Sequence, residues 1–405
     1  MMTGASRKRS LERISLLGDL IPDHHALRAG VLSELGRVIP FSAFVWPLSD
    51  PATGTGISPM ARIPCPEDLP LLIRLKYLTT VGRWTTLAGR GSPVTTLLSE
   101  TGGNPPQSLV WDSLLNRYGV VDVLYAGFAD KYGYWGWLDL WRTAEQGAFT
   151  ADEVRYVAAA VSRVTPALRR SVSRQFFRAG PVPPPADAPD DGRPRGSGPS
   201  DVGGTPDVGG TPDVGRTPDV GGTRKVDLPP QGVLTLSEDM AVLGGTVSID
   251  EWLGLLQPGP EPYQHVPAEV LNVAAQLLAL EAGVDRHPAW SRVYLGAGRW
   301  AMLRASRMGP AAPATSHREA TPPLAVTIQA CPPEERLDIF ARSFGLTPRQ
   351  RQLLELAAGG RDTVAMAKTL GISTYTVQDQ FKQIFDACAV HTRAALLAMA
   401  LGTAL

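Results

Sequence analysis

The sequence predicts an α+β multidomain protein that ends in an all-α unit, and three observations support this prediction. The chain has 405 residues, which is too long for one compact core and suggests two or three domains. Helical and strand patterns alternate on both sides of a segment rich in glycine and proline, and the C-terminal part shows helical periodicity only. We therefore expect an α+β unit over residues 1–178, a linker over 179–230, a smaller α+β unit over 231–332 and a helical unit over 333–405.

The N-terminal unit is predicted to combine helices with a largely antiparallel sheet. Apolar residues three and four apart indicate the helices, and two apolar, aromatic runs separated by a short polar turn are typical of a β-hairpin. The predicted elements are helices over residues 11–20 and 25–38, a strand over 41–48, and hairpin strands over 120–129 and 134–141. The pattern over residues 151–177 predicts one long helix that leaves the unit.

The segment over residues 179–230 is predicted to be a disordered linker. It contains 12 proline and 11 glycine residues among 52, with almost no large apolar side chain. The hexamer Asp-Val-Gly-Gly-Thr-Pro begins at Asp201 and again at Asp207, recurs with one change from Asp213 and is truncated from Asp219. A flexible segment of this length has a root-mean-square span of about 40 Å.

The second unit is predicted to be a small α+β unit. Short runs of β-branched and aromatic residues flank two helical patterns, and glycines mark a hairpin turn. The predicted elements are strands over residues 232–236, 291–295, 300–306 and 325–330, and helices over 248–256 and 268–282.

Composition and charge point to a cytoplasmic protein without a membrane segment. Lys+Arg and Asp+Glu are both 39, so any affinity for nucleic acid must come from a local patch. Cys65, Cys331 and Cys388 are scattered, with no spacing for zinc or redox work, which fits a reducing compartment. Charged residues interrupt the first twenty positions, which excludes a signal peptide there.

The sequence does not predict an enzyme. It lacks the phosphate-binding Gly-x-x-x-x-Gly-Lys loop, Gly-x-Gly-x-x-Gly, His-Glu-x-x-His and Gly-x-Ser-x-Gly. His24 and His25 are adjacent, so on a helix they point about 100° apart and make a poor metal pair. We therefore expect no catalytic residue, no metal and no cofactor.

The motif with the clearest functional meaning lies near the C-terminus. Thr347 is placed to cap a helix that starts at Pro348, and Asp362 is placed to cap a second helix. Gly371 supplies a tight turn, and Ser373 is placed to cap a third helix. Two short helices joined by a glycine turn form a helix-turn-helix.

The third helix of this motif is predicted to have one buried and one polar side. Apolar residues recur on one side at Val377, Phe381, Ile384 and Phe385. The opposite side is polar and could reach base edges in a major groove. Its candidate base-contacting residues are Tyr375, Gln378, Asp379 and Lys382.

At these residues the chain resembles the LuxR-type DNA-binding domain over about sixty residues. The residues at pattern positions are Leu346, Thr347, Pro348, Arg349, Arg351, Leu370, Gly371, Ile372, Ser373, Thr376, Val377, Ile384, Val390 and Arg393. The resemblance implies that Gln378, Asp379 and Lys382 read bases and that Ser373 and Thr376 lie near phosphates. It also implies dimerisation through the helix over residues 392–401.

The predicted partner is double-stranded DNA, bound as a homodimer. The phosphate-contact candidates are Arg349, Arg351, Arg361, Lys368, Ser373, Thr376 and Arg393. The sequence departs from the LuxR-type pattern at Gln378 and Gln380, where lysine and histidine are common, and at residues 387–389, where Ala-Cys-Ala replaces Lys-Leu-Gly. With six Lys or Arg against four Asp or Glu over residues 346–405, a net of +2, we expect weak DNA binding.

The upstream units resemble sensory domains by the order of their elements. The part up to about Phe177 resembles a GAF-like domain, and residues 231–331 resemble a PAS-like unit. Such a domain could hold an unidentified small-molecule ligand in a pocket lined by aromatic residues, although aromatics at alternating strand positions also build cores. The pocket candidates are Tyr125, Trp111 and Trp135, with Trp137 and Trp141 beside them.

Three hypotheses follow from the sequence. The first is a cytoplasmic DNA-binding transcription regulator with N-terminal signal-sensing domains. The second is a protein-interaction relative of dominant-negative type, whose degenerate DNA-binding module pairs with a functional homologue. The third is a ligand-binding enzyme that uses the N-terminal pocket.

Overall fold

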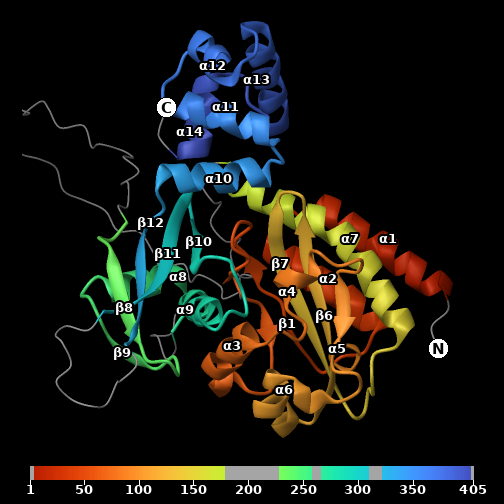
Figure 1. Cartoon of the computed structure of the whole chain (residues 1–405). Coiled ribbons are helices and arrows are strands. Elements are labelled where there is room, and N and C mark those ends of the chain that lie inside the picture. The colour runs from red at the N-terminus through yellow and green to blue at the C-terminus, as the bar shows by residue number, and fades with distance from the viewer. Residues whose placement is uncertain (1–3, 178–227, 258–265, 310–321, 403–405) are drawn as a thin grey trace, which may run out of the picture. The chain divides into compact units, whose positions relative to one another are not determined.

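The computed structural model of the chain describes residues 4–177, 228–257, 266–309 and 322–402 (Figure 1). Contacts between Cα atoms divide the chain into one unit of Met1–Arg178 with Pro229–Leu405 and another of Ala179–Leu228. The hexapeptide repeats, and nearly all of the linker predicted over residues 179–230, lie outside the described residues. The described part is mixed α+β with a helical C-terminal region, as predicted.

The first half contains a five-stranded antiparallel sheet with the strand order β4-β1-β7-β6-β5. Its strands are β1 (Ala43–Val45), β4 (Ala61–Arg62), β5 (Val94–Thr96), β6 (Val120–Asp130) and β7 (Gly133–Thr143). The predicted hairpin is confirmed: β6 and β7 pair from Val120 opposite Thr143 to Asp130 opposite Gly133.

The strand predicted over residues 41–48 is wrong in its length. It is divided into β1 and β2 (Leu48–Ser49), and β2 pairs with β3 (Gly56–Ile57) in a separate two-stranded sheet. Trp46 still exchanges backbone hydrogen bonds with Met60, but Pro47 follows it. Because proline has no N–H, it cannot donate the next bond of the ladder, and the strand ends there.

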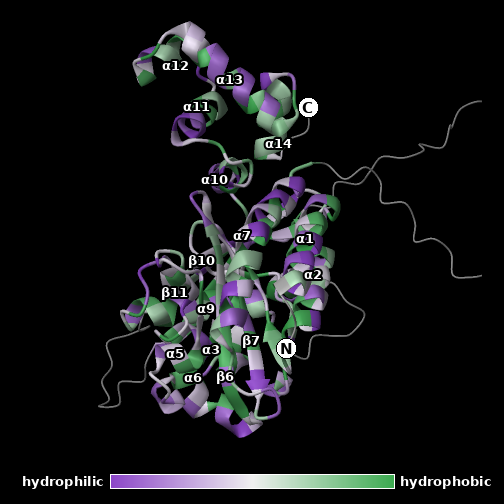
Figure 2. Cartoon of the chain, turned by 90° about the vertical axis from the view of Figure 1, so that its right-hand side faces the viewer, coloured by the Kyte–Doolittle hydropathy of each residue, from purple (hydrophilic) through white to green (hydrophobic). Residues whose placement is uncertain are grey.

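Helices cover both sides of this sheet. Helices α1 (Gly4–Leu20), α2 (His24–Val38) and α7 (Ala151–Arg174) pack together on one side, as Figures 1 and 2 both show. Residues from α3 (Leu69–Leu78) and α6 (Leu109–Ser113) share a buried apolar cluster with Val123, Tyr125 and Trp141 of the sheet. The remaining elements of this half are α4 (Trp84–Leu87), α5 (Leu97–Glu100), and the 3-10 turns η1 (Pro66–Asp68), η2 (Pro105–Gln107) and η3 (Leu115–Tyr118). The sequence reasoning did not predict α3 to α6.

The prediction that the last helix of this half leaves the unit is wrong. Helix α7 begins at a capping box made by Thr150 and Glu153, and it lies against α1 and β6. Its apolar residues Val157, Val161, Val164 and Leu168 are buried. Their spacing of three and four residues makes a continuous stripe, and burying that stripe against the sheet is what holds α7 in place.

The second half contains another five-stranded antiparallel sheet, with the order β10-β11-β12-β8-β9. Its elements are β8 (Gly232–Leu236), β9 (Val242–Gly245), α8 (Ile249–Leu256), α9 (Ala268–Glu281), β10 (Trp290–Gly296), β11 (Arg299–Arg307) and β12 (Leu324–Ala330). The predicted elements are confirmed, and only the edge strand β9, whose four residues are all exposed, was not predicted. When the strands of each sheet are numbered in chain order, both sheets have the order 2-1-5-4-3.

Helix α9 connects the two halves. Eleven of its 14 residues are buried, and it contacts both α3 of the first half and β11 of the second. The Asn272 side-chain amide donates to the Gly56 carbonyl at 3.1 Å, and the Ser58 backbone N–H donates to the Glu269 carboxylate at 3.0 Å. The two α+β halves are therefore packed against each other within one compact unit.

The C-terminal region contains only helices, as predicted. They are α10 (Pro333–Ser343), α11 (Pro348–Ala358), α12 (Thr363–Leu370), α13 (Thr374–Cys388) and α14 (Arg393–Leu401). Helix α10 contacts α11 and α14 as well as α7 of the first half. Among the described residues no single helix has the length and hydropathy to cross a membrane; α13 and α14 reach that threshold only together, as a pair bent by 56°.

Candidate functional site

The caps predicted for the helix-turn-helix are all present. Thr347 and Gln350 form a capping box at the start of α11, and Pro348 is the first residue of that helix. The Asp362 carboxylate accepts from the Ala365 backbone N–H at 2.7 Å at the start of α12. Gly371 ends α12 with a φ of 63°, a left-handed conformation that glycine adopts without steric cost. Gly371 and the N-cap Ser373 of α13 set the two ends of the turn between α12 and α13.

Helix α13 has the two sides that the sequence predicts. Val377, Phe381 and Ile384 are buried, while Phe385 is half-buried. The four base-contact candidates Tyr375, Gln378, Asp379 and Lys382 are all exposed, and Tyr375 is 78% exposed. The Asp379 carboxylate accepts from the Gln383 side-chain amide at 2.9 Å. The exposed side of α13 is therefore polar, with one acidic and one basic residue among the candidates.

Three arginines among the phosphate candidates are engaged inside the protein. Arg349 donates to the Leu370 carbonyl at the end of α12, and Arg393 donates to the Arg361 carbonyl in the turn after α11. Arg351 lies 2.5 Å from the Asp338 carboxylate and 2.9 Å from that of Glu355. Arg349 and Arg393 thus satisfy backbone carbonyls, and two carboxylates neutralise Arg351.

The other phosphate candidates differ from these. The hydroxyl of Ser373 caps α13 by accepting from the Thr376 N–H at 3.0 Å, and it lies 2.9 Å from the Thr376 hydroxyl. Arg361 and Lys368 are exposed, and within the described ranges their side chains make no hydrogen bond or ion pair, like that of Lys382. The module therefore presents Arg361, Lys368 and Lys382 as its free cations in the part that the structure describes.

Part of the predicted dimerisation helix is covered by the same chain. Leu396 and Ala400 of α14 are buried, and α14 contacts α10. The Arg336 guanidinium on α10 donates to the Ala400 carbonyl at 3.1 Å and to the Met399 carbonyl at 3.3 Å. Helices α11 and α13 also contact α14, so a partner chain could use only the part of α14 that these three helices leave accessible.

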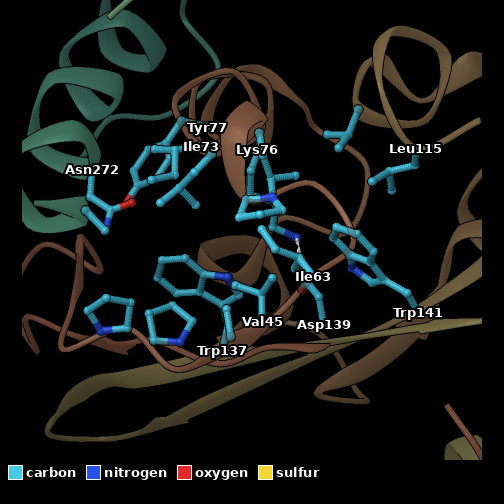
Figure 3. A pocket seen from close by; sticks show the side chains of 18 of the residues that line it. Val45, Ile63, Ile73, Lys76, Tyr77, Leu115, Trp137, Asp139, Trp141 and Asn272 are labelled. Atoms are coloured by element: carbon cyan, nitrogen blue, oxygen red, sulfur yellow. Dashed lines mark hydrogen bonds and ion pairs between the residues drawn. The ribbon is translucent and has the colours of Figure 1, made fainter. Parts of the chain in front are cut away.

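A second candidate site is a cavity of about 390 Å³ in the first half. It lies among α3, the β7 face of the sheet and the start of α9, as the side chains in Figure 3 show. Of the predicted pocket residues, Tyr125 lines the cavity, together with Trp137 and Trp141. Trp111 and Trp135 are not among its lining residues: Trp111 donates to the Val120 carbonyl at 2.7 Å, and Trp135 donates to the Asp130 carboxylate at 2.9 Å.

A buried ion pair forms the polar part of the cavity wall. The Lys76 ammonium lies 2.8 Å from the Asp139 carboxylate and 4.3 Å from the centre of the Tyr125 ring, and it also donates to the Gly82 carbonyl at 3.3 Å. Burial lowers the pKa of Lys76 and raises the pKa of Asp139, while their mutual attraction opposes both shifts. Burial also raises the pKa of Tyr125 well above its usual value.

The sequence reasoning missed Lys76 and Asp139. Lys76 lies in the run Leu-Pro-Leu-Leu-Ile-Arg-Leu-Lys-Tyr-Leu, and Asp139 interrupts an apolar strand. Charges inside apolar runs were the available signal, because a charge is buried only with a partner; the run around Lys76 also holds Arg74, so the sequence does not show which of the two is buried.

Within the described ranges, no group of three or more His, Cys, Asp or Glu side chains is placed to hold a metal ion. Comparison of the chain with protein-family models and with curated protein sequences finds no match.

Proposed function

We propose that the chain is a sequence-specific DNA-binding transcription regulator that reads DNA through α13. The observation that carries this proposal is the turn at Gly371, which joins two capped helices and leaves the polar side of the second one exposed. Helices joined in this way place the second helix in a major groove, where its side chains reach base edges. Tyr375, Gln378, Asp379 and Lys382 are the residues proposed for that contact.

The resemblance to LuxR-type modules supports the proposal through the structural roles of its pattern residues. Thr347 and Ser373 cap helices, Gly371 makes the turn, and Arg393 holds the turn between α11 and α12. These residues build the scaffold, so their presence supports the fold of a reader module. The DNA contacts themselves depend on the exposed residues of α13.

The charge distribution predicts modest and mainly specific binding. Only Arg361, Lys368 and Lys382 offer free positive charge on the described part of the module, and Asp379 lies on the reading side. Because each neutralised phosphate adds about 0.9 to the salt slope, three such contacts give a shallow salt dependence. Affinity must then come from polar contacts to bases and from a second module in a homodimer.

We further propose that the two α+β halves act as GAF-like and PAS-like sensory units of a cytoplasmic regulator. Their common strand order supports a shared architecture, and the cavity supports a sensing role for the first half. The packing of α9 between the halves gives a route by which occupancy of one half affects the other.

Selection of DNA fragments by the full chain tests this proposal. The chain should enrich particular fragments from a random-sequence pool, and its affinity for them should fall as salt rises. Lys382→Ala should lower the salt slope by about one, because it removes one cation from the DNA-facing helix. Lys131→Ala is the matched control, since Lys131 is exposed in the β6–β7 turn, outside the module.

Two results would contradict the reader proposal. One is the absence of any fragment that binds better than random DNA at low salt, and the other is a Lys382→Ala chain indistinguishable from the parent. Self-association through the module without DNA binding would favour the interaction-protein hypothesis instead.

A further inference from the structure

We propose that the cavity among α3, β7 and α9 binds an uncharged aromatic molecule of about two fused rings that carries one hydroxyl or carbonyl group. The inference deepens the sensory role proposed for the first half. It rests on that proposed role and on the cavity, and its test uses no DNA, so it can fail or succeed independently of DNA binding.

The size of the cavity sets the size of the ligand. Its volume of about 390 Å³ lies within the range of about 300 to 1,000 Å³ that is usual for small-molecule sites. An apolar cavity of about 150 Å³ is enough for one benzene ring. The cavity therefore has room for two fused rings with a small substituent.

The walls favour an aromatic ligand. Most lining residues are apolar, including Val45, Pro47, Ile73 and Leu115, and the rings of Trp137 and Trp141 lie among them (Figure 3). The Trp137 ring is held rigidly, because it stacks on Trp84 with a centroid distance of 3.9 Å. A flat apolar ligand that packs against rigid aromatic and aliphatic walls excludes water from them, and this removal of apolar surface from water favours binding.

The ion pair in the wall favours an uncharged ligand. The Lys76 ammonium is already bound by the Asp139 carboxylate, the Gly82 carbonyl and the Tyr125 ring. Both side chains of the pair are less than one-tenth exposed. A carboxylate ligand would have to displace Asp139 and leave that charge buried without a partner, which is strongly unfavourable. A cationic ligand would have to displace Lys76 from Asp139 and leave the ammonium group buried without its partner, which is also unfavourable.

Two polar groups of the wall have no hydrogen-bond partner among the described residues: the buried Nε1–H of Trp137 and the hydroxyl of Tyr125. Tyr125 is only 4% exposed and lines the cavity, yet its hydroxyl makes no hydrogen bond with the described residues. A buried hydroxyl without a partner is unfavourable, and buried tyrosines usually have one. A ligand hydroxyl or carbonyl next to Tyr125 would satisfy it.

Equilibrium dialysis of the full chain against three naphthalene derivatives tests the proposal. The probes are 2-naphthol, which is uncharged and polar at one end, naphthalene, which lacks the polar group, and 2-naphthoate, which is an anion. We expect one 2-naphthol per chain, with weaker binding of naphthalene and the weakest binding of 2-naphthoate.

Variants of the chain locate the site. Tyr125→Phe should weaken 2-naphthol binding about threefold to tenfold and leave naphthalene binding unchanged, because only the hydrogen bond is lost. Tyr156→Phe is the matched control: Tyr156 is equally buried, but its hydroxyl lies 2.8 Å from that of Ser10, on the α7 side of the sheet. Ala61→Trp places a bulky ring in the cavity wall from an exposed strand and should abolish binding of all three probes.

Each contrary result overturns a defined part of the proposal. Binding that survives Ala61→Trp lies elsewhere on the protein. Tighter binding of 2-naphthoate than of 2-naphthol shows that the site takes anions, and no measurable binding of any probe overturns the proposal as a whole. The thermal midpoint of Tyr125→Phe should match that of the parent chain, which separates a lost contact from a lost fold.

Discussion

The buried Arg28 shows how one charged residue changes the pKa of a neighbour, here His24. The Arg28 side chain is 1% exposed and donates to the carbonyls of Trp46 at 2.6 Å and Ser58 at 2.9 Å. Within the described ranges no carboxylate forms an ion pair with it, and burial lowers its pKa to about 10. Its guanidinium also lies 3.1 Å from Nδ1 of His24. Burial and this adjacent charge together lower the pKa of His24 to about 4.

We predict that His24 makes the folded protein sensitive to mild acid. In the unfolded chain His24 takes up a proton near its ordinary pKa of 6.5, but in the folded chain it stays neutral down to about pH 4. The unfolded state therefore binds more protons between these values, and the free energy of unfolding decreases as the pH falls through this window, by up to about 3 kcal/mol. Urea denaturation followed at several pH values measures this decrease.

Neighbouring histidines provide the control for this prediction. His24→Gln keeps a hydrogen-bond acceptor for Arg28 but cannot be protonated, so its stability should change less between pH 6.5 and 4. His25→Gln should behave like the parent chain, because His25 is exposed. An unchanged pH dependence in His24→Gln would show that other groups cause the acid sensitivity.

Arginines also show what the sequence could not reveal about the candidate DNA interface. Arg349, Arg351 and Arg393 were predicted as phosphate contacts because they are basic and occupy pattern positions. Their partners are the Leu370 carbonyl, the Asp338 carboxylate and the Arg361 carbonyl, and two of these three partners are backbone atoms. Backbone partners leave no trace in the side-chain pattern, so sequence reasoning cannot separate a structural arginine from a free one.

At the scale of elements, helix caps were predicted correctly from the sequence, whereas the packing of elements far apart in the chain was not. Caps at Thr347, Asp362 and Ser373 depend on residues within one turn, and all three were predicted from the sequence. The course of α7 depends instead on whether its apolar stripe finds a partner, and the sequence does not show that β6 lies beside it. The cavity was missed in part for the same reason, since Lys76 and Asp139 are 63 residues apart.

The end of α13 gives a prediction at this scale. Ala389 ends the helix with a φ of 52°, at a position where the LuxR-type pattern has glycine. A left-handed conformation costs a residue with a Cβ atom about 1 kcal/mol, so Ala389→Gly should stabilise the module by about that amount. Gly371→Ala should have the opposite effect, because Gly371 has a φ of 63°.

Comparison of these two variants isolates backbone strain from packing. Among the described residues, no atom lies within 4 Å of the position that a Cβ atom would take at Gly371, so the cost of Gly371→Ala comes from the backbone conformation alone. Hydrogen exchange of the amides in α13 reports the local free energy of opening for both variants. Equal exchange in parent and Ala389→Gly chains would mean that α13 opens without releasing its C-terminal cap.

At the scale of the whole molecule, one arginine joins three parts of the chain. Arg292 on β10 donates to the Asp50 carboxylate of the first half at 2.8 Å and to the Asp338 carboxylate of α10 at 2.8 Å. Asp338 in turn pairs with Arg351 of α11 at 2.5 Å. This ionic network runs from the cavity-bearing half to the C-terminal helices, which a single hydrogen bond from Arg342 of α10 to the Tyr132 carbonyl also joins to the first half.

We predict that Arg292→Met lowers the free energy of unfolding by about 3 to 5 kcal/mol. Arg292 and Asp50 are both 0% exposed, and removal of the arginine side chain leaves the Asp50 carboxylate buried without a cationic partner, held only by backbone N–H groups such as those of Ala52 and residue 292. Arg304→Met is the matched control, because Arg304 lies on the neighbouring strand and pairs with Glu335 at 3.2 Å while remaining half-exposed. An exposed pair of this kind contributes about 1 kcal/mol or less.

A double variant distinguishes a coupled pair from two separate effects. Asp50→Asn in the Arg292→Met background removes the unpaired charge, so the double variant should be more stable than Arg292→Met alone. Urea denaturation followed by tryptophan fluorescence measures all four chains of the cycle. If Arg292→Met costs no more than Arg304→Met, the network does not hold the halves and the module together. The Arg83–Asp285 ion pair between the halves and the Arg342 bond to the Tyr132 carbonyl would then be the polar contacts to test next.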